Sequence, residues 1–385
     1  MDRRSFITGA AVGAAAGAAA VGAIMATRKQ PAPQMAEPAP VAAPAAPAIN
    51  TGMRELRMVT TWPKDFPGLG TGAQRLADRI TAMTDGRITV KLFAAGELVP
   101  PFESFDAVSS GNADCLHAAA YYWQGKSKAF NFFTAVPFGL TASELNAWIH
   151  HGGGQALWDK LGAEFNLKSF LAGNTGVQMG GWFRSEVNTP EDFNGLKFRM
   201  PGLGGEVLRR LGAAVVALPG GEIFPSLQSG AIDATEWVGP WNDLAFGFYR
   251  VAKFYYYPGF HEPGSGLECT WNLDLWNSFS ASEQTMIGAA CSAENDIMLA
   301  EFNARNTDAL DTLVSQHGVE LRKFSDSIYQ AFAGAAEDVL AEAGQSDALT
   351  GEIYDSFIEF RRKAMSWTTL SDQSYADLRT KFIGG

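Results

Sequence analysis

The sequence predicts an α/β protein of two doubly wound lobes, and three observations support this fold class. Strand and helix patterns alternate in two separate blocks, over residues 56–116 and 196–237. A long uninterrupted helical pattern follows both blocks. The chain has 385 residues, and even without its atypical N-terminus it is too long for one compact core. Each strand–helix–strand unit predicts parallel strands, because parallel neighbours need a crossover connection between them.

The first block begins with alternating apolar residues over 56–62, which predict a strand. Helical spacing follows over 70–84, and alternation returns over 87–93. A helix over 102–110 and a short strand over 113–116 complete this block. We therefore expect a parallel sheet in the first lobe.

The second block repeats the pattern. Its predicted strands and helices, in chain order, are strand 196–200, helix 205–211, strand 213–218, helix 222–229 and strand 231–237. Ligands of doubly wound proteins bind beyond the carboxyl ends of the strands. Residues that follow strands in the two blocks are therefore the candidates for a binding site.

The C-terminal third is predicted to be helical. Ser280 and Glu283 have the spacing of a capping box, and no Gly or Pro interrupts residues 289–317. A helix of about 36 residues is roughly 54 Å long, so we expect it to brace both lobes. Two further amphipathic helices are predicted near 327–343 and 350–365.

The N-terminus has the pattern of an export signal. Arg3 and Arg4 precede Phe6, an Ala/Gly-rich apolar run and a second basic pair. Residues 1–29 are therefore predicted to be a twin-arginine signal, with an uncleaved anchor as the alternative. Residues 30–53 are rich in Pro and Ala, a composition typical of an extended tether. We expect the folded part, 54–385, to work in the periplasm.

Composition excludes several classes of function. The formal net charge is -11, and removing residues 1–29 leaves about -14, so the protein repels nucleic acid. Three scattered cysteines and five histidines show no metal-ligand spacing. No Walker A loop and no G-x-S-x-G motif is present. Gly202, Gly204 and Gly205 follow a predicted strand, but their spacing does not supply the last glycine of the G-x-G-x-x-G dinucleotide motif. We therefore expect no organic cofactor.

Arg199 is the most informative residue. It lies between Phe198 and Met200 at the end of an apolar strand, with no acidic residue within six positions. An unpaired buried charge is very costly, so its partner is either distant in sequence or a ligand. A guanidinium group matches a carboxylate with two hydrogen bonds, which indicates capture of a small organic acid.

Glu236 and Trp237 end the predicted strand DATEW. One interpretation of Glu236 is an ion pair with a Lys or Arg. The other is a hard-cation site, since Na⁺ and Ca²⁺ bind carboxylate, amide and main-chain oxygens. In that site Gln178 supplies an amide oxygen and Trp237 a main-chain carbonyl. The sequence leaves both interpretations open.

An aromatic cluster follows the strand over 113–116. Tyr121 and Tyr122 either pack in the core or direct a hydroxyl group at a ligand. The other candidates for the lining of the same cleft are Asn174, Trp182, Trp241, Phe260 and Glu262.

Several segments together resemble a known family. The segments GNTGVQMGGWFR, LKFRMPG, LPGGEIFPSLQSGAIDATEW and FHEPG resemble the extracytoplasmic solute-binding subunits of TRAP transporters, the DctP-like family. The resemblance covers residues 54–370 and is strongest to the 2-oxo acid and lactate-type members. It implies a type II-like periplasmic binding protein with two lobes, hinge strands and a long bracing helix. It also implies that Arg199 clamps a substrate carboxylate and that Gln178, Glu236 and Trp237 hold a bridging Na⁺ or Ca²⁺.

We therefore expect a non-enzymatic receptor for a small 2-oxo or 2-hydroxy monocarboxylate, similar to pyruvate, 2-oxobutyrate or lactate. It would deliver its ligand to the small and large membrane permease subunits. The predicted substrate-binding residues are Arg199, Gln178, Tyr121, Tyr122, Asn174 and Glu262. The predicted lobes are residues 54–147 and 148–231, each with part of the segment after 232, and helices fill 281–385. The C-terminal helices suit a homodimer, although a monomer fits the sequence equally well.

Two alternatives come from other classes. Twin-arginine export suits an exported oxidoreductase that carries a cofactor, but the Cys, His and Gly patterns disfavour it. A sugar-binding receptor is favoured by the 10 tryptophans and disfavoured by the lone strand-end arginine. The sequence fixes neither the acid nor the choice between Na⁺ and Ca²⁺.

Overall fold

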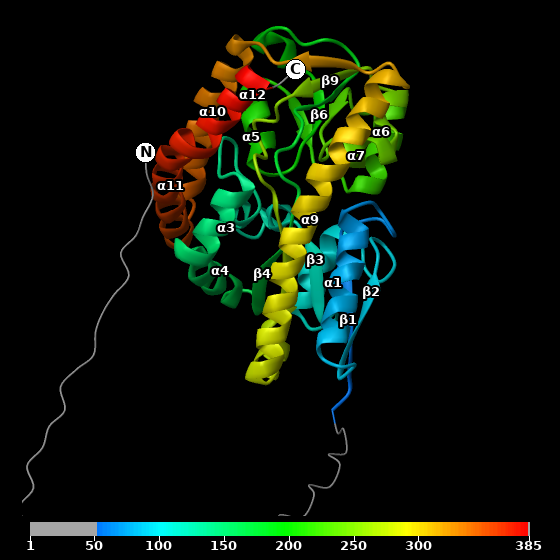
Figure 1. Ribbon diagram of the computed structural model, residues 1–385, viewed down its shortest axis with the longest axis vertical. Coiled ribbons are helices and arrows are strands. Elements are labelled where there is room, and N and C mark those ends of the chain that lie inside the picture. Colours follow the sequence, from blue (N-terminus) through cyan, green and yellow to red (C-terminus); the bar gives the residue numbers. More distant parts are fainter. Residues whose placement is uncertain (1–51, 384–385) are drawn as a thin grey trace, which may run out of the picture. The chain divides into compact units, whose positions relative to one another are not determined.

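Two mixed sheets organise residues 52–383, the part of the chain that the computed structural model describes (Figure 1). The predicted export signal and nearly all of the predicted tether lie outside these residues. The first sheet has the strand order β2-β1-β3-β10-β4. Its strands are β1 (Arg54–Thr60), β2 (Ile88–Phe93), β3 (Cys115–Ala118), β4 (Leu167–Asn174) and β10 (Gly266–Asn272).

The first predicted block is confirmed. β1 pairs in parallel with β2 and with β3. The connecting helices are α1 (Leu69–Met83) and α2 (Ser104–Ser109). β10 is antiparallel to both β3 and β4 and was not predicted. All seven residues of β10 are buried, so its sequence carries no polar–apolar alternation.

The second sheet has the order β11-β9-β5-β8-β6-β7. Its predicted parallel part is confirmed in β6 (Lys197–Arg199), β7 (Ala214–Val216) and β8 (Ala234–Thr235), with helices α5 (Gly202–Arg210) and α6 (Gly220–Ser229) between them. β5 (Gly181–Phe183) and β9 (Phe254–Tyr257) add antiparallel pairs, and β11 (Glu320–Lys323) lies parallel to β9.

Two extended segments connect the sheets. The chain leaves the first sheet after Asn174, enters the second at Gly181, and returns between Tyr257 and Gly266. The segments lie side by side, because the Gln178 N–H donates to the Glu262 carbonyl (3.1 Å) and the Gly259 N–H donates to the Gln178 carbonyl (2.9 Å). A Cβ atom on Gly259 would lie 2.7 Å from that carbonyl oxygen, so this close approach requires glycine.

These segments are the hinge strands that the family resemblance implies. The division into lobes at residues 147 and 148 stays a prediction. Sheet membership favours a boundary after β4, because residues 167–174 belong to the first sheet.

Helix α9 (Ala281–Ser315) connects the two sheets along one side (Figure 1). The Ser280 hydroxyl accepts from the Glu283 N–H, and the Glu283 carboxylate accepts from the Ser280 N–H, which confirms the capping box. The helix packs against α1 and β4 of the first sheet and against α7 (Pro240–Phe246) beside the second. The predicted bracing role is therefore confirmed.

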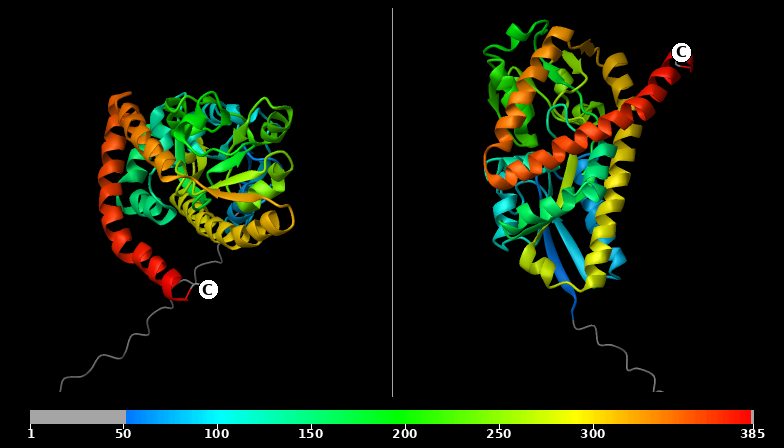
Figure 2. Two further views of the ribbon diagram at one scale, coloured as in Figure 1. Left: turned by 90° about the horizontal axis from the view of Figure 1, so that it is seen from above. Right: turned by 90° about the vertical axis from the view of Figure 1, so that its left-hand side faces the viewer.

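The remaining helices cover the other side of both sheets (Figure 2). α10 packs on α5, and α11 packs on α3 and α4. The four helices on that side are α3 (Ala142–His151), α4 (Gly154–Ala163), α10 (Asp326–Gly344) and α11 (Ala348–Thr368). The two others, α8 (Leu273–Asn277) and α12 (Ser374–Ile383), lie elsewhere. Single turns of other helix types occur at Pro101–Glu103, Ala120–Trp123, Lys128–Phe133, Pro190–Phe193, Phe248–Arg250 and Thr369–Gln373. Within residues 52–383, no helix is both long enough and apolar enough to span a bilayer.

The largest apolar core lies between these helices and both sheets. Phe133 stacks on Trp148 and on Trp158, with ring centroids 5.4 and 4.8 Å apart. Phe260, which follows β9, stacks on Phe332 of α10 at 4.0 Å. This packing holds the second hinge strand against the C-terminal helices.

Candidate binding site

A small cavity lies where the strand ends of both sheets meet the hinge strands. It is nearly closed in this structure, with about 10 Å³ open to the centre of a water-sized sphere. Both sheets contribute, because its walls include residues that follow β1, β3 and β8. The cavity is lined by Trp62, Leu69, Tyr121, Tyr122, Thr175, Gln178, Trp237, Val238, Glu262, Ser265 and Leu267. This is the place that the doubly wound fold predicts for a ligand.

A larger, open groove lies on the other side of the first hinge strand. Its walls come from α9, α7, β11 and the residues Val177 and Met179, and Asp311 is its single ionisable residue. The smaller cavity is the candidate site, because ionisable and unpaired polar groups gather there.

Arg199 ends β6 and is 1% exposed. Its Nη1 donates to a carboxylate oxygen of Glu236 and to the Glu236 carbonyl oxygen, the latter at 3.1 Å. Its Nε donates to the Leu218 carbonyl at 3.1 Å, and its Nη2 has no partner. Burial is the largest influence on the pKa of Arg199 and lowers it, but the interactions with Glu236, Tyr122, Tyr121 and Glu262 together outweigh burial, so the pKa is raised. The guanidinium is therefore charged and keeps one free donor.

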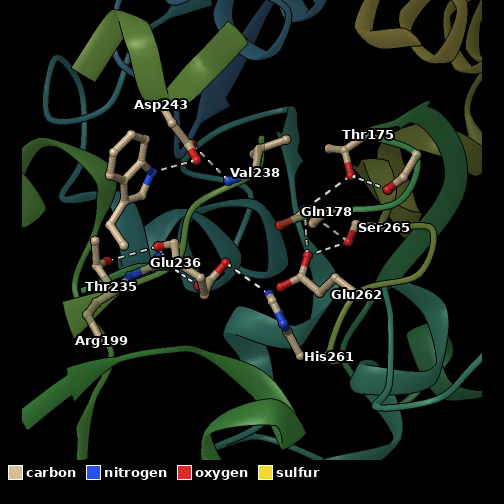
Figure 3. A network of polar contacts seen from close by, with 12 residues as sticks. Thr175, Gln178, Arg199, Thr235, Glu236, Val238, Asp243, His261, Glu262 and Ser265 are labelled. Atoms are coloured by element: carbon tan, nitrogen blue, oxygen red, sulfur yellow. Dashed lines mark hydrogen bonds and ion pairs between the residues drawn. The ribbon is translucent and has the colours of Figure 1, made fainter. Parts of the chain in front are cut away.

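Glu236 pairs with two buried side chains. Besides Arg199, His261 Nε2 lies 3.3 Å from its second carboxylate oxygen (Figure 3). Both partners are distant in sequence, at 37 and 25 positions. The ion-pair interpretation of Glu236 therefore describes the structure, and Arg199 is the base concerned.

Gln178 and Glu262 form the second polar group, on the two hinge strands. Gln178 Nε2 lies within hydrogen-bond distance of Glu262 (2.8 Å), Thr175 Oγ1 (3.1 Å) and Ser265 Oγ (3.2 Å), and its two hydrogens serve two of these three acceptors at a time. Its Oε1 is buried and has no partner. Burial, and then the charge of Glu236, raise the pKa of Glu262. The amide is thus held in one orientation with its oxygen free.

Aromatic rings form the walls between the two polar groups. Tyr121 and Tyr122 meet edge to face at 4.9 Å, and Trp62 lies 6.2 Å from both Tyr122 and Trp237. Arg199 Cζ lies 5.2 Å from the Trp237 ring, a cation–π contact. Burial is the main cause that raises the pKa of Tyr122 to about 12, so its hydroxyl group is neutral.

Of the predicted residues, Tyr121, Tyr122, Gln178, Trp237 and Glu262 line the cavity, whereas Arg199 and Glu236 do not. Glu236 is nevertheless close, because a carboxylate oxygen of Glu236 lies within 4.8 Å of one of Glu262.

Four other residues predicted near the cleft lie elsewhere. The Asn174 amide is used inside the hinge strands, where it accepts from the Gly176 N–H at 2.8 Å and donates to the Gly264 carbonyl at 3.4 Å. Trp182 stacks on Tyr255, Trp241 packs on Phe302, and Phe260 stacks on Phe332. Of these four, only Asn174 was a predicted substrate ligand.

Sequence reasoning missed several residues that the structure brings to the cavity. Trp62 follows β1, the position where ligands are expected in this fold class. Thr175 and Ser265 flank the known motif residues but carry no signal of their own. His261 was overlooked because it is single, although its ring nitrogen and the carboxylates of Glu236 and Glu262 come within 4.8 Å of one another.

The donor set fits a hard cation. Such ions bind oxygen ligands, and Gln178 Oε1 is an oxygen without a partner beside two carboxylates. Among residues 52–383 no hydrogen-bond donor pairs with the Trp237 carbonyl oxygen. Arg199 supplies one positive charge beside the carboxyl groups of Glu236 and Glu262. A bound organic acid adds a negative charge, which an additional cation would neutralise.

Comparison with known proteins identifies the family. The model of the bacterial extracellular solute-binding proteins of family 7, DctP, matches residues 58–347. A monocarboxylate 2-oxoacid-binding periplasmic protein of Nostoc sp. strain PCC 7120 is 44% identical over 330 residues, which are 85% of this chain and 90% of the relative.

Two solved TRAP transporter solute-binding proteins share the fold. One, from Bordetella bronchiseptica RB50, is a mixed-occupancy dimer with copurified calcium and picolinate in one site. It is 34% identical with a TM-score of 0.85, over 86% of this chain and 99% of its own. The other, from Pseudoalteromonas atlantica T6c, holds sodium and pyruvate and is 38% identical with a TM-score of 0.82, over 84% and 98% of the two chains.

The family match covers more than half of this chain, and the resemblance seen in its motifs is confirmed. The two-lobed α/β fold predicted from the sequence is confirmed as well. This chain is a member of the DctP family, the extracellular solute-binding proteins of TRAP transporters.

Proposed function

We propose that this protein captures a small 2-oxo or 2-hydroxy monocarboxylate together with a Na⁺ or Ca²⁺ ion and delivers it to TRAP permease subunits. One observation carries the proposal. Two buried polar atoms without partners among residues 52–383 differ in kind. Gln178 Oε1 belongs to a residue of the cavity wall, and Arg199 Nη2 belongs to the partner of Glu236, whose carboxylate lies within 4.8 Å of that of Glu262 in the wall. A donor on a cation suits a carboxylate, and an amide oxygen suits a metal ion.

The carboxylate binds at Arg199 in this proposal. Nη2 is free for one carboxylate oxygen, whereas Nη1 already donates to Glu236. A two-bond clamp therefore requires Glu236 to leave Nη1. A cation beside Glu236 gives its carboxylate a new partner, so loading the cation frees Nη1 for the substrate. Cation and acid would then bind cooperatively.

The cation is held by Gln178, Glu236 and the Trp237 carbonyl. The ion pair and the cation site would then be two states of Glu236. Its carboxylate would contact Arg199 before the cation binds and the cation afterwards. The 2-oxygen of the acid would complete the oxygen ligands of the ion. Glu262 orients Gln178 through a 2.8 Å hydrogen bond, and Tyr121 and Tyr122 close the acid side of the cavity.

The chemistry of the walls favours a short acid. Trp62, Leu69 and Leu267 surround the remaining space with apolar surface. A sugar presents many hydroxyl groups, which these walls leave without partners. The relative from Pseudoalteromonas holds pyruvate, and the Nostoc relative is described as a 2-oxoacid-binding protein, so pyruvate is the first acid to test.

Lobe closure about the hinge strands would enclose the ligand, as in other hinged receptors. The family is extracellular, and we place this protein in the periplasm. We expect no chemical turnover. A bound acid recovered unchanged after denaturation would support a receptor, and a converted product would contradict it.

Calorimetry tests the proposal. Protein stripped of metal with a chelator is titrated with pyruvate, 2-oxobutyrate and lactate, each with and without Na⁺ or Ca²⁺. We expect binding of a 2-oxo acid that strengthens at least about tenfold with cation, roughly 1.4 kcal/mol. Unchanged affinity in the absence of any cation would contradict the bridging ion, and failure of all three acids would contradict the ligand class.

We also propose that the protein forms a homodimer through its last helix. Figure 2 shows α12 at the end of the α11 helix, away from both sheets. Between 55% and 75% of each of five large side chains is exposed there, namely Trp367, Leu370, Tyr375, Leu378 and Phe382. Their spacings of three, five, three and four place them on one face, because the turn over Thr369–Gln373 is wider than an α-helical turn.

A second copy is favoured as the partner of this face. The Bordetella relative is a dimer, and the acidic body of this chain disfavours an anionic membrane. Light scattering should give the mass of two chains for the wild type and of one chain for Leu370→Glu/Leu378→Glu. A wild-type monomer at tens of micromolar would contradict the proposal.

A further inference from the structure

Asp243 is a buried carboxylate that the proposed binding mode does not use. It lies in the first turn of α7 and is 1% exposed. Its Oδ2 accepts from Tyr255 Oη (2.6 Å) and from Trp182 Nε1 (2.9 Å), and its Oδ1 accepts from the Val238 N–H (3.3 Å). All three donors are neutral. Among residues 52–383 no basic side chain lies within ion-pair distance of it.

The third donor connects Asp243 to the binding site. The Val238 nitrogen and the Trp237 carbonyl belong to one peptide group, which is planar and trans. In such a group the N–H and C=O bonds point in opposite directions. The hydrogen bond from Val238 to Asp243 therefore fixes the direction of the Trp237 carbonyl oxygen, away from α7. Figure 3 shows Asp243 directed at Val238, on the chain that continues from Glu236.

The next peptide group is fixed as well. The Val238 carbonyl accepts from the Met179 N–H at 3.1 Å, and Met179 follows Gln178 in the first hinge strand. The segment that carries Glu236 and Trp237 is thus held between α7 on one side and the hinge strand on the other. A chain segment held at both sides presents its carbonyl oxygen in one orientation.

A negative charge at this position also changes the carbonyl electronically. A carboxylate that accepts from an N–H polarises the peptide group, and the carbonyl oxygen at the other end becomes more negative. Trp182 and Tyr255 keep the carboxylate in place through neutral hydrogen bonds, with no counter-ion beside it. Burial raises the pKa of Asp243 to about 7, so the group carries its full charge only above that pH, and we specify pH 8 for the calcium titrations. Partners of this kind orient and tune the ligands of many metal sites.

We propose that Asp243 is a positioning residue that aims and polarises the Trp237 carbonyl, and so sets the cation affinity of the site. This inference rests on the proposed function, because it requires a cation at Trp237. It assigns Asp243 no contact with the organic acid. The charge of Asp243 acts on the cation, while Arg199 governs the carboxylate.

The test separates cation affinity from acid affinity in the full-length protein. Calcium alone is titrated into metal-free wild type, Asp243→Asn and Tyr255→Phe, with tryptophan fluorescence and calorimetry as readouts. Pyruvate is then titrated at saturating calcium. Asp243→Asn should weaken calcium binding about tenfold or more and change pyruvate affinity less than about threefold. Tyr255→Phe removes one neutral partner, keeps the bond to Val238, and should change both affinities less than about threefold.

Three outcomes would overturn the inference. Asp243→Asn could bind calcium as wild type does, it could lose calcium and pyruvate affinity equally, or Tyr255→Phe could lose as much calcium affinity as Asp243→Asn. If Asp243→Asn does not fold, Asp243→Glu takes its place, since it keeps the charge but displaces the oxygens and should weaken calcium binding selectively. If wild-type protein binds pyruvate equally well without a cation, the proposed function itself is contradicted. Calorimetry of the wild type shows this before any variant is made.

Discussion

Two arginine–glutamate pairs with a buried glutamate differ in how many of the arginine's nitrogens have a partner. Arg75 of α1 donates hydrogen bonds from Nε and Nη2 to the Glu294 carboxylate of α9, at 2.6–3.1 Å. Its Nη1 lies 3.1 Å from a carboxylate oxygen of Glu301. Arg199 of β6 holds Glu236 through Nη1 alone and keeps Nη2 without a partner. Glu294 and Glu236 are both at most 1% exposed.

The difference separates a structural pair from a binding pair. The Arg75 pair joins helices α1 and α9 and uses all three guanidinium nitrogens. The Arg199 pair lies at a strand end beside a cavity and has unused hydrogen-bonding capacity. A buried donor without a partner is costly, and close to a cavity a bound ligand can supply the missing partner. Breaking each pair should therefore damage a different property.

The largest effect is expected at Arg199. Arg199→Ala removes the only free cationic donor that we place on the substrate, and pyruvate affinity should fall at least about 100-fold, roughly 2.7 kcal/mol. Arg75→Ala is the matched control, with pyruvate affinity within about twofold of wild type. Calorimetry at saturating calcium measures both. Equal losses in the two variants would erase the distinction between the pairs.

The second effect is a loss in the free energy of unfolding when the Arg75–Glu294 pair is broken. Arg75→Ala removes the hydrogen-bonded basic partner of the fully buried Glu294 carboxylate and leaves the weaker interaction with Arg79 of α1. Because Arg75 itself is 30% exposed, we expect a loss of about 2 to 3 kcal/mol in the free energy of unfolding, below the range for a wholly buried pair. Urea unfolding measures it. The double variant Arg75→Ala/Glu294→Gln should recover part of the loss, and a further loss would contradict the account.

The third effect concerns the free amide oxygen. Gln178→Met keeps the length of the side chain but removes Oε1, so calcium binding should weaken about tenfold or more. Thr175→Val removes one acceptor of the Gln178 amide and leaves Oε1 in place; calcium affinity should change less than about threefold. Fluorescence titration with calcium compares the variants. Calcium affinity unchanged in Gln178→Met would remove Gln178 from the cation site.

The smallest effect on ligand binding is expected at a carboxyl group of the first sheet, whose role is in stability. Burial raises the pKa of Glu268 on β10 to about 7, against hydrogen bonds from Thr270 and Trp123 that lower it. The folded state thus keeps a proton that the unfolded state releases from about pH 4.5 upward. Stability falls as pH rises from about 4.5 to about 7, by up to about 3 kcal/mol for a shift of this size, and Glu268→Gln should remove most of that fall.

Urea unfolding at pH 5 and pH 7.5 measures that difference. Pyruvate affinity of Glu268→Gln should equal that of wild type, because Glu268 does not line the cavity. A variant whose stability falls with pH as steeply as that of the wild type would contradict the raised pKa. Loss of ligand affinity would show that this structural carboxyl group belongs to the site.

The sequence predicts the fold best where side chains alternate in polarity. The strands over 56–62 and 87–93 and the capping box at Ser280 are found for that reason. β10 is missed because it lies between β3 and β4 and all its residues are buried. β4 is an edge strand, but six of its eight residues are buried, so its sequence lacks a regular alternation as well. Their antiparallel pairing depends on contacts between residues about 100 positions apart, which periodicity does not reveal.

The candidate site shows the same limit. Arg199, Gln178 and Glu236 are predictable because each breaks a local rule, a polar group in an apolar strand or turn. The pairing of Arg199 with Glu236 is set by the adjacency of β6 and β8, and the role of Asp243 depends on the direction of one peptide group. Asn174 is also a polar residue at the end of an apolar strand, but its side chain hydrogen-bonds within the hinge strands.

A crystal structure of the protein grown with pyruvate and calcium tests the central claim most directly. The account predicts a carboxylate oxygen within hydrogen-bond distance of Arg199 Nη2 and a calcium ion about 2.3 to 2.6 Å from Gln178 Oε1 and from the Trp237 carbonyl oxygen. Both buried atoms that lack partners would then be satisfied. A ligand bound elsewhere, with Arg199 Nη2 and Gln178 Oε1 still unpaired, would contradict it.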